Sequence, residues 1–186
     1  MKTALVAAML LALAGSARAE RPDLRVDVEP AAYVLRGFSV HLRSSNPWQP
    51  RLVVGLGAYG FDMPELLVDL AAANRDEDWD VRLFLGTNVF ADYFFGASPR
   101  EGWLAGGQIG LQHFRAERDA QEEVVVTLVL MARVGYEWHP WKTSGFYLFP
   151  WLGAAYTPEI AREGDDLGYA TPAVTPYGAV ELGWRF

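Results

Sequence analysis

The sequence contains no cysteine, so disulfides and thiolate metal sites are excluded. An exported domain of this size would have to rely on packing or on a closed network of hydrogen bonds. Beyond residue 19 the chain also lacks an apolar run of the roughly 20 residues that a membrane helix needs. Yet 51% of the residues are hydrophobic and 13% are aromatic, which is rich for an acidic domain. The hydrophobic residues must therefore be arranged in a pattern other than that of a membrane helix.

The first 19 residues have the layout of a secretory signal. Lys2 precedes an apolar run over residues 4–14, and small residues follow as far as Ala19. We predict cleavage after Ala19 and a single domain over residues 20–186; the alternative is a retained N-terminal anchor. Without Lys2 and Arg18, 14 basic residues face 23 acidic ones, a formal charge of −9. This charge predicts no nucleic-acid partner.

The C-terminal segment shows the clearest pattern, an alternation with a period of two. Its apolar positions are Val180, Leu182, Trp184 and Phe186, and they alternate with Ala179, Glu181, Gly183 and Arg185. One face is thus apolar, whereas the other is small or charged. This alternation is typical of a strand with lipid on one side and a polar lumen on the other.

Similar patterns predict seven further strands. We place them over residues 24–29, 37–43, 51–60, 81–93, 103–115, 124–138 and 146–156. Fifteen residues, as in 124–138, is long for a soluble sheet but suits a tilted membrane strand. Residues 23–43 could form one strand or two; a turn at Arg36-Gly37 gives two, and a barrel with both termini on one side needs an even number. We therefore expect an all-β, antiparallel up-and-down barrel of eight strands.

The connections differ in length. Three are short and turn-like, namely 44–50, 96–102 and 139–145, and three are longer and acidic, namely 62–78, 116–123 and 157–172. In outer-membrane barrels the short turns face the periplasm and the long loops face outward. A short helix is expected in the first long loop, with Asp62 as its cap, Pro64 in its first turn and an apolar face of Leu66, Leu67 and Leu70.

On these residues the chain resembles the small outer-membrane barrels of the OmpX and opacity-protein type, over about residues 23–186. The strongest element is the ending Leu182-Gly183-Trp184-Arg185-Phe186. The resemblance implies that Val180, Leu182, Trp184 and Phe186 form a signal for the outer-membrane barrel assembly machinery. It also implies an outer-membrane location, with outer-membrane lipids and lipopolysaccharide as partners.

Polar side chains are expected to gather inside the barrel. The predicted lumen residues are Arg82, Gln108, Gln112, Arg133, Glu137, Glu181 and Arg185. Eight strands leave room only for side chains, so ion pairs and hydrogen bonds are favoured over a selective pore or proton path. Aromatic residues near strand ends predict a girdle at the membrane interface, formed by Trp48, Trp103, Trp138, Trp141, Tyr147 and Trp184.

Catalysis and metal binding have little support in the sequence. Ser39 and His41 point the same way on one strand, but no third partner or serine elbow is recognisable. The histidines lie on different segments without ligand spacing, so we expect neither a metal nor another cofactor. The acidic loop residues could bind calcium or magnesium but lack a known motif; they are Asp76, Glu77, Asp78, Glu122, Glu123, Asp165 and Asp166.

Three classes of function follow. The favoured class is a membrane barrel with a structural, surface-interaction or small-solute role and no catalysis. The alternatives are a membrane-embedded lipid hydrolase that uses Ser39 and His41, and a soluble, lipocalin-like periplasmic carrier of an apolar ligand. A soluble barrel would turn its apolar face inward.

Overall fold

The computed structural model describes residues 23–46, 48–96, 101–119, 121–164 and 167–186, so the predicted signal segment lies outside the described residues. The strands are β1 (Leu24–Val28), β2 (Phe38–Ser45), β3 (Leu52–Asp62), β4 (Asp80–Phe94), β5 (Gly102–Arg118), β6 (Gln121–Glu137), β7 (Phe146–Tyr156), β8 (Glu159–Gly164) and β9 (Val174–Arg185). Two short α-helices, α2 (Pro30–Val34) and α3 (Glu65–Val68), and a 3-10 turn, η1 (Ala72–Asn74), complete the described elements.

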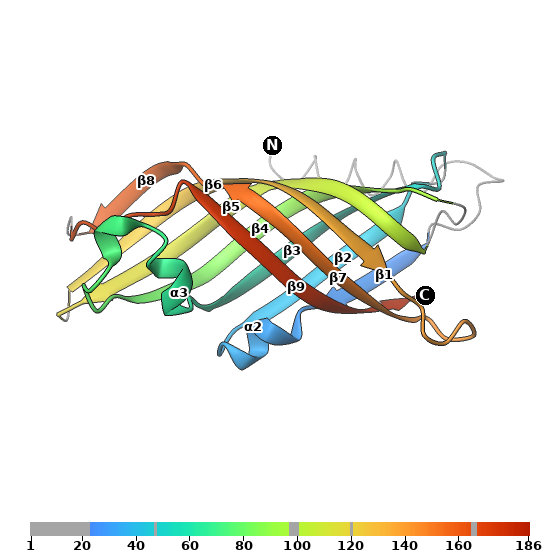
Figure 1. The fold of residues 1–186 in the computed structure, drawn as a ribbon, viewed down its shortest axis with the longest axis horizontal. Helices are drawn as coiled ribbons and strands as arrows, with labels where there is room; N and C mark the ends of the chain where they lie inside the picture. The colour runs from blue at the N-terminus through green and yellow to red at the C-terminus, as the bar shows by residue number, and fades with distance from the viewer. Residues whose placement is uncertain (1–22, 47, 97–100, 120, 165–166) are drawn as a thin grey trace, which may run out of the picture.

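Eight of these strands close into an antiparallel barrel (Figure 1). Each strand pairs with the next along the chain, β9 pairs with both β7 and β1, and the β5–β6 pairing completes the ring. The remaining strand, β8, continues the line of β7 alongside β6 after a break at Thr157-Pro158. The predicted all-β barrel of eight strands is confirmed.

The register fixes the tilt of the strands. Following directly paired residues around the barrel from Arg25 leads to Thr175, whereas Arg25 itself pairs with Arg185, ten residues further along β9. A stagger of ten residues over eight strands requires a tilt of about 40°. The interior of such a barrel is wide enough only for the side chains of its own strands. This width decides whether a solute could pass through the lumen.

The two ends of the barrel differ. One end carries the C-terminal ends of β2, β4 and β6, the turn 138–145 and the C-terminus of the chain; we call it the short-turn end (Figure 1). At the other lie α3, η1, β8 and the long β5–β6 hairpin, which together form the long-loop end. Leu24 and Phe186 are joined at the short-turn end by a backbone hydrogen bond of 2.9 Å.

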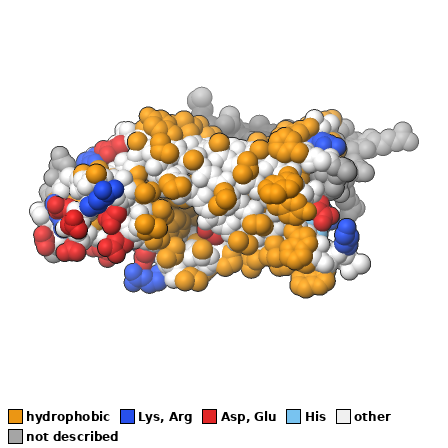
Figure 2. All heavy atoms as spheres, in the orientation of Figure 1, with side chains coloured by type: hydrophobic (Ala, Val, Ile, Leu, Met, Phe, Trp, Pro, Cys, Tyr) orange, Lys and Arg blue, Asp and Glu red, His pale blue; other side chains and the backbone are white. Residues whose placement is uncertain are grey.

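Along the strands of the wall, side chains alternate between the lumen and the outer surface as expected for a membrane barrel. On β6 every second residue from Glu123 to Glu137 is buried, whereas Leu130 and Val134 on the other face are 40% and 54% exposed. On β7, Leu152 is 70% exposed. Figure 2 shows apolar side chains spread over the strands and charged ones gathered at the end that carries α3 and β8. The apolar side chains of the wall therefore point outward, away from the lumen.

No helix among the described residues is long and apolar enough to cross a membrane. The exterior does not resemble that of a soluble barrel, because a water-soluble protein rarely exposes a continuous apolar belt. The lipocalin-like alternative required the apolar faces to point inward. The burial pattern therefore does not favour it.

The structure corrects several local predictions. Residues 30–34 form the helix α2, which projects from the wall between β1 and β2, where only a turn at Arg36-Gly37 was predicted (Figure 1). Residues 116–123 are not a long loop, because β5 extends to Arg118 and β6 begins at Gln121. The predicted loop 157–172 contains β8.

The predicted loop helix exists, but its details differ. α3 has only four residues, and Pro64 occupies the N-cap position without a side-chain cap bond. Asp62 is the last residue of β3 and binds two arginines, so it does not cap the helix. Val68 is buried, whereas the expected apolar residue Leu66 is 78% exposed.

Candidate functional site

The half of the lumen nearer the short-turn end is filled by charged side chains, which we call the ion-pair cluster. Its members are Arg25, Asp27, Arg43, Asp92, Arg133, Glu137 and Glu181, each at most 4% exposed. They come from β1, β2, β4, β6 and β9, on the inward face of each strand. The period-two alternation of these strands therefore sends the charges to one place.

The ion pairs of the cluster are short and shared. Arg25 Nη1 lies 2.6 Å from Glu137 Oε2. The Asp92 carboxylate accepts two hydrogen bonds from Arg133, at 2.8 and 3.0 Å, and lies 3.2 Å from Arg43 Nη2. Arg43 Nη1 also lies 3.4 Å from Asp27 Oδ2 and 3.5 Å from Glu137 Oε2. Each buried charge thus has a partner, which is the condition for tolerating it.

Aromatic rings fill the space beside the guanidinium groups. Arg43 lies 4.8 Å from the centre of the Phe149 ring, and Arg133 lies 4.7 Å from that of Phe90. Tyr147 donates a hydrogen bond to Asp27. The charges and rings together close this part of the lumen, because an eight-stranded barrel leaves no further space.

A polar layer lies next along the lumen, towards the long-loop end. Gln112 Nε2 donates to the Tyr59 hydroxyl at 3.1 Å, and Asn88 Nδ2 donates to Gln108 Oε1 at 3.1 Å. Several buried polar atoms of this layer have no hydrogen-bond partner among the described residues: Ser39 Oγ, His41 Nδ1, Asn88 Oδ1, Gln112 Oε1 and Thr127 Oγ1. Such atoms are suited to binding internal water.

Ser39 and His41 both lie in this layer, buried and on one strand face. Since neither Ser39 Oγ nor His41 Nδ1 has a hydrogen-bond partner in the part of the chain that the structure describes, the two side chains do not form the nucleophile–base hydrogen bond of a hydrolase. Asp27 is the cross-strand neighbour of His41, but its carboxylate is bound by Tyr147 and Arg43. The arrangement therefore lacks an assembled catalytic relay.

An apolar cluster fills the lumen at the long-loop end. Its buried members are Val68, Val81, Leu83, Phe114, Ala116, Val125 and Tyr169. Tyr169 comes from the segment between β8 and β9 and packs against Trp79, with ring centres 5.5 Å apart. Burial raises the pKa of the Tyr169 phenol above its usual value, so the group stays neutral. Residues 167–173 therefore cover the apolar cluster, and we call them the cap.

Polar contacts hold the cap in place. The Glu123 carboxylate accepts hydrogen bonds from the backbone N–H groups of Tyr169, at 2.7 Å, and Leu167, at 3.2 Å. Asn74 and Ala170 exchange two hydrogen bonds, at 2.8 and 2.9 Å, between a side-chain amide and the backbone. The cap is thereby joined to both the barrel wall and the loop that carries η1.

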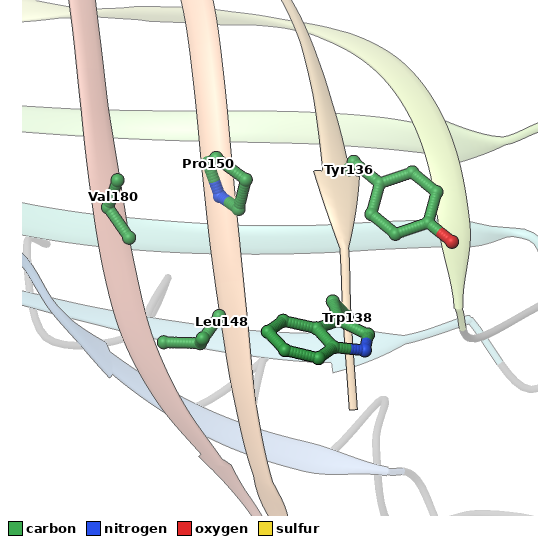
Figure 3. A pocket seen from close by; sticks show the side chains of 5 residues that line it. All are labelled: Tyr136, Trp138, Leu148, Pro150 and Val180. Carbon is green, nitrogen blue, oxygen red and sulfur yellow. The ribbon is translucent and has the colours of Figure 1, made fainter. Parts of the chain in front are cut away.

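The outer wall carries an aromatic zone near the short-turn end. Trp48, Trp103, Trp138, Trp141 and Trp184 are all exposed there, at 48–77%. Tyr147 does not belong to this zone, because it is fully buried in the lumen. A shallow apolar groove of about 450 Å³ lies on this surface, and Figure 3 shows the side chains that line it. It is lined by Tyr136, Trp138, Leu148, Pro150 and Val180.

Six of the seven predicted lumen residues separate into three groups. Arg133, Glu137 and Glu181 belong to the ion-pair cluster, and Gln108 and Gln112 belong to the polar layer. Arg185 lies at the short-turn mouth, 3.7 Å from Asp23. Sequence reasoning missed Arg25, Asp27, Arg43 and Asp92, although each directly follows an apolar residue in an alternating segment, a pattern that could have identified them.

Arg82 is a correction, because it lies outside the barrel. A bulge at Phe84 inserts one extra residue into β4 and reverses the direction of the side chains before it. Val81 and Leu83 therefore face the lumen, and Arg82, with 45% of its side chain exposed, binds Asp62.

The acidic loop residues do not converge on a metal site. Among the residues described, no group of three or more His, Cys, Asp or Glu side chains could hold a metal ion. Glu123 is buried and binds the cap, and Glu122 pairs with Arg115. Asp165 and Asp166 lie outside the described residues.

Comparison with known proteins supports the fold class. No protein-family model matches the chain, and no curated protein matches it by sequence. The crystal structure of Neisserial surface protein A (NspA) is similar, with a TM-score of 0.54 and 11% identity, over 88% of this chain and 95% of that one. At this identity the similarity concerns the fold. The protein has the fold of a small outer-membrane β-barrel.

Proposed function

We propose that the protein is an integral outer-membrane barrel with a surface-interaction or structural role, and that it is neither a pore nor an enzyme. The observation that carries this proposal is an apolar exterior around a lumen filled by buried ion pairs. The exterior suits lipid, whereas the filled interior leaves no space for a solute. The long-loop end would face outward, because long loops face outward in such barrels.

Planar-bilayer recording tests whether the barrel conducts. The folded mature protein should give no conductance above that of the bare bilayer, while a porin recorded under the same conditions gives open-channel steps. Reproducible steps from the wild-type protein would reject the closed-lumen proposal and favour a small-solute role. Incorporation is checked independently by flotation of the vesicles that carry the protein.

We further propose that the C-terminal strand is the signal recognised by the assembly machinery. Val180, Trp184 and Phe186 are exposed on the lipid-facing side, with Phe186 75% exposed, and Leu182 lies on the same face, half-buried. Deletion of Phe186 should lower assembly in cells while folding into detergent is retained. Phe38→Ala, which truncates another exposed phenylalanine, is the control; equal assembly of all three proteins would reject the signal.

A lipid hydrolase is the less favoured candidate, since Ser39 and His41 are not hydrogen-bonded to each other. Lipid composition should be unchanged by expression of the protein. A change that depends on both residues, lost in Ser39→Ala and His41→Ala variants that still fold, would overturn this exclusion.

A further inference from the structure

Three arginines gather on the outer surface where the apolar belt meets the long-loop end. Arg36 follows α2, Arg82 lies on β4 and Arg115 lies on β5; we call them the arginine patch. Their side chains are 79%, 45% and 44% exposed. Arg82 and Arg115 are direct cross-strand neighbours. The three charges therefore lie at one height on one side of the barrel.

This arrangement is unfavourable unless an anion compensates it, because like charges directly opposite each other destabilise a sheet. The compensation within the chain is partial. Asp62 binds both Arg36, at 2.5 Å, and Arg82, at 2.6 Å, while Arg115 lies 3.2 Å from Glu122. Three guanidinium groups thus share two carboxylates, and two further acidic side chains of this face, Asp80 and Glu117, form a cross-strand pair two residues closer to the long-loop end.

The guanidinium groups have donors to spare. Each carries five N–H donors in a plane. Within the described part of the chain, Arg82 uses Nη1 for Asp62 and Nη2 for the Arg36 carbonyl oxygen, at 3.2 Å. The centre of the Phe84 ring lies 5.6 Å from the Arg115 guanidinium carbon, so the ring supports that group against the wall. The patch can therefore bind another acceptor without rearranging.

The surface immediately beyond the patch, towards the short-turn end, is mostly apolar, with His113 and Thr87 as its polar residues. Leu85 and Val89 on β4 are 37% and 54% exposed, and Ile109 and Leu111 on β5 are 48% and 38% exposed. A ligand that fits both regions has an anionic head at the arginines and hydrocarbon chains along these side chains. Arginine binds phosphate oxygens with paired, charge-assisted hydrogen bonds.

We propose that the arginine patch binds the phosphate-bearing headgroup of an outer-leaflet lipid whose acyl chains lie against β4 and β5. This inference rests on the proposed function, because it requires the long-loop end to face the outer leaflet. It assigns a site to the expected partnership with lipopolysaccharide. Inorganic phosphate shares the headgroup chemistry but lacks the chains.

The experiment measures binding of fluorescent bisphosphorylated lipid A to the mature protein folded in detergent, with EDTA present. The double variant Arg82→Gln/Arg115→Gln should bind about tenfold more weakly, as expected when charge-assisted contacts are removed. The charge-matched control, Arg75→Gln/Lys142→Gln, should bind as the wild type does, since both exposed residues lie away from the patch. Dephosphorylated lipid should bind all proteins equally weakly.

Each contrary result has a definite meaning. Equal affinity of the patch variant and the control would reject the patch, as would binding that EDTA abolishes, which would assign it to cations at acidic loops. Full competition by millimolar inorganic phosphate would reject the lipid as the source of the phosphate. Folding is measured separately by heat-dependent gel migration. If the barrel forms but binds all these lipids equally, the arginine patch is rejected and the proposed function is not.

Discussion

The two halves of the lumen are filled by opposite chemistry. Towards the short-turn end, charged side chains form a paired network in which Asp92 and Glu137 each pair with two arginines. Towards the long-loop end, apolar side chains pack beneath a loop anchored by Glu123. The first half is held by the closed wall, whereas the second also depends on a chain segment that folds over it. This difference predicts that substitutions in the ion-pair cluster destabilise the whole barrel, whereas substitutions in the cap disrupt only the long-loop end.

The largest effect is expected from Asp92→Ala in the ion-pair cluster. This change leaves Arg43 and Arg133 without their shared carboxylate and should lower the free energy of unfolding by about 3–5 kcal/mol. Urea unfolding in detergent, followed by tryptophan fluorescence, measures the loss. The control is Asp80→Ala, an exposed position at the start of the same strand, which should change stability by less than about 0.5 kcal/mol. Similar values for the two variants would contradict the paired-network account.

A smaller effect is expected from Tyr169→Ala in the cap. Removing this ring should cost about 2–3 kcal/mol, less than the 3–5 kcal/mol typical of a fully enclosed aromatic residue, because the site opens to water. Limited proteolysis should detect faster cleavage in the segment between β8 and β9. Tyr156→Ala, on the exposed face of β7, serves as the control. If the cap were cleaved no faster than in that control, Tyr169 would not be holding it.

The smallest effect is expected from Glu123→Gln. The change removes the charge that accepts hydrogen bonds from Leu167, Tyr169 and Arg162 and should cost about 1–2 kcal/mol. The faster cleavage should again be confined to the cap, with heat-dependent migration unchanged. Glu122→Gln, at the neighbouring exposed position, should leave the cleavage rate unchanged; an equal effect of both variants would show that buried Glu123 has no special role.

The wall could be predicted from the sequence because its period of two is continuous over most strands. Residues 146–156 were placed without error, and β6 was placed within three residues at either end. The alternation in β9 also assigned Glu181 to the inner face. A shift of one residue along a strand would have turned its inward side chains outward. An unbroken alternation therefore shows which residues of a strand face the lumen.

Features that interrupt the period could not be predicted. The bulge at Phe84 reverses the side chains before it, so that Val81 and Leu83 face inward and Arg82 faces outward, and nothing in the local composition marks it. α2 has five residues, too few to show a helical period, and Pro30 indicated only an interruption. β8 was missed because its residues are exposed on both faces, so it shows no alternation. The cap depends on contacts between residues far apart in the sequence, such as Asn74 and Ala170.

The most direct test of the central claim compares boiled and unboiled samples of the folded mature protein on semi-native gels, together with its distribution among cell fractions. A closed membrane barrel keeps its hydrogen-bond network in detergent until it is heated. The account predicts a heat-dependent shift in migration and recovery of the protein in the outer-membrane fraction. A soluble periplasmic monomer with identical migration before and after boiling would contradict it.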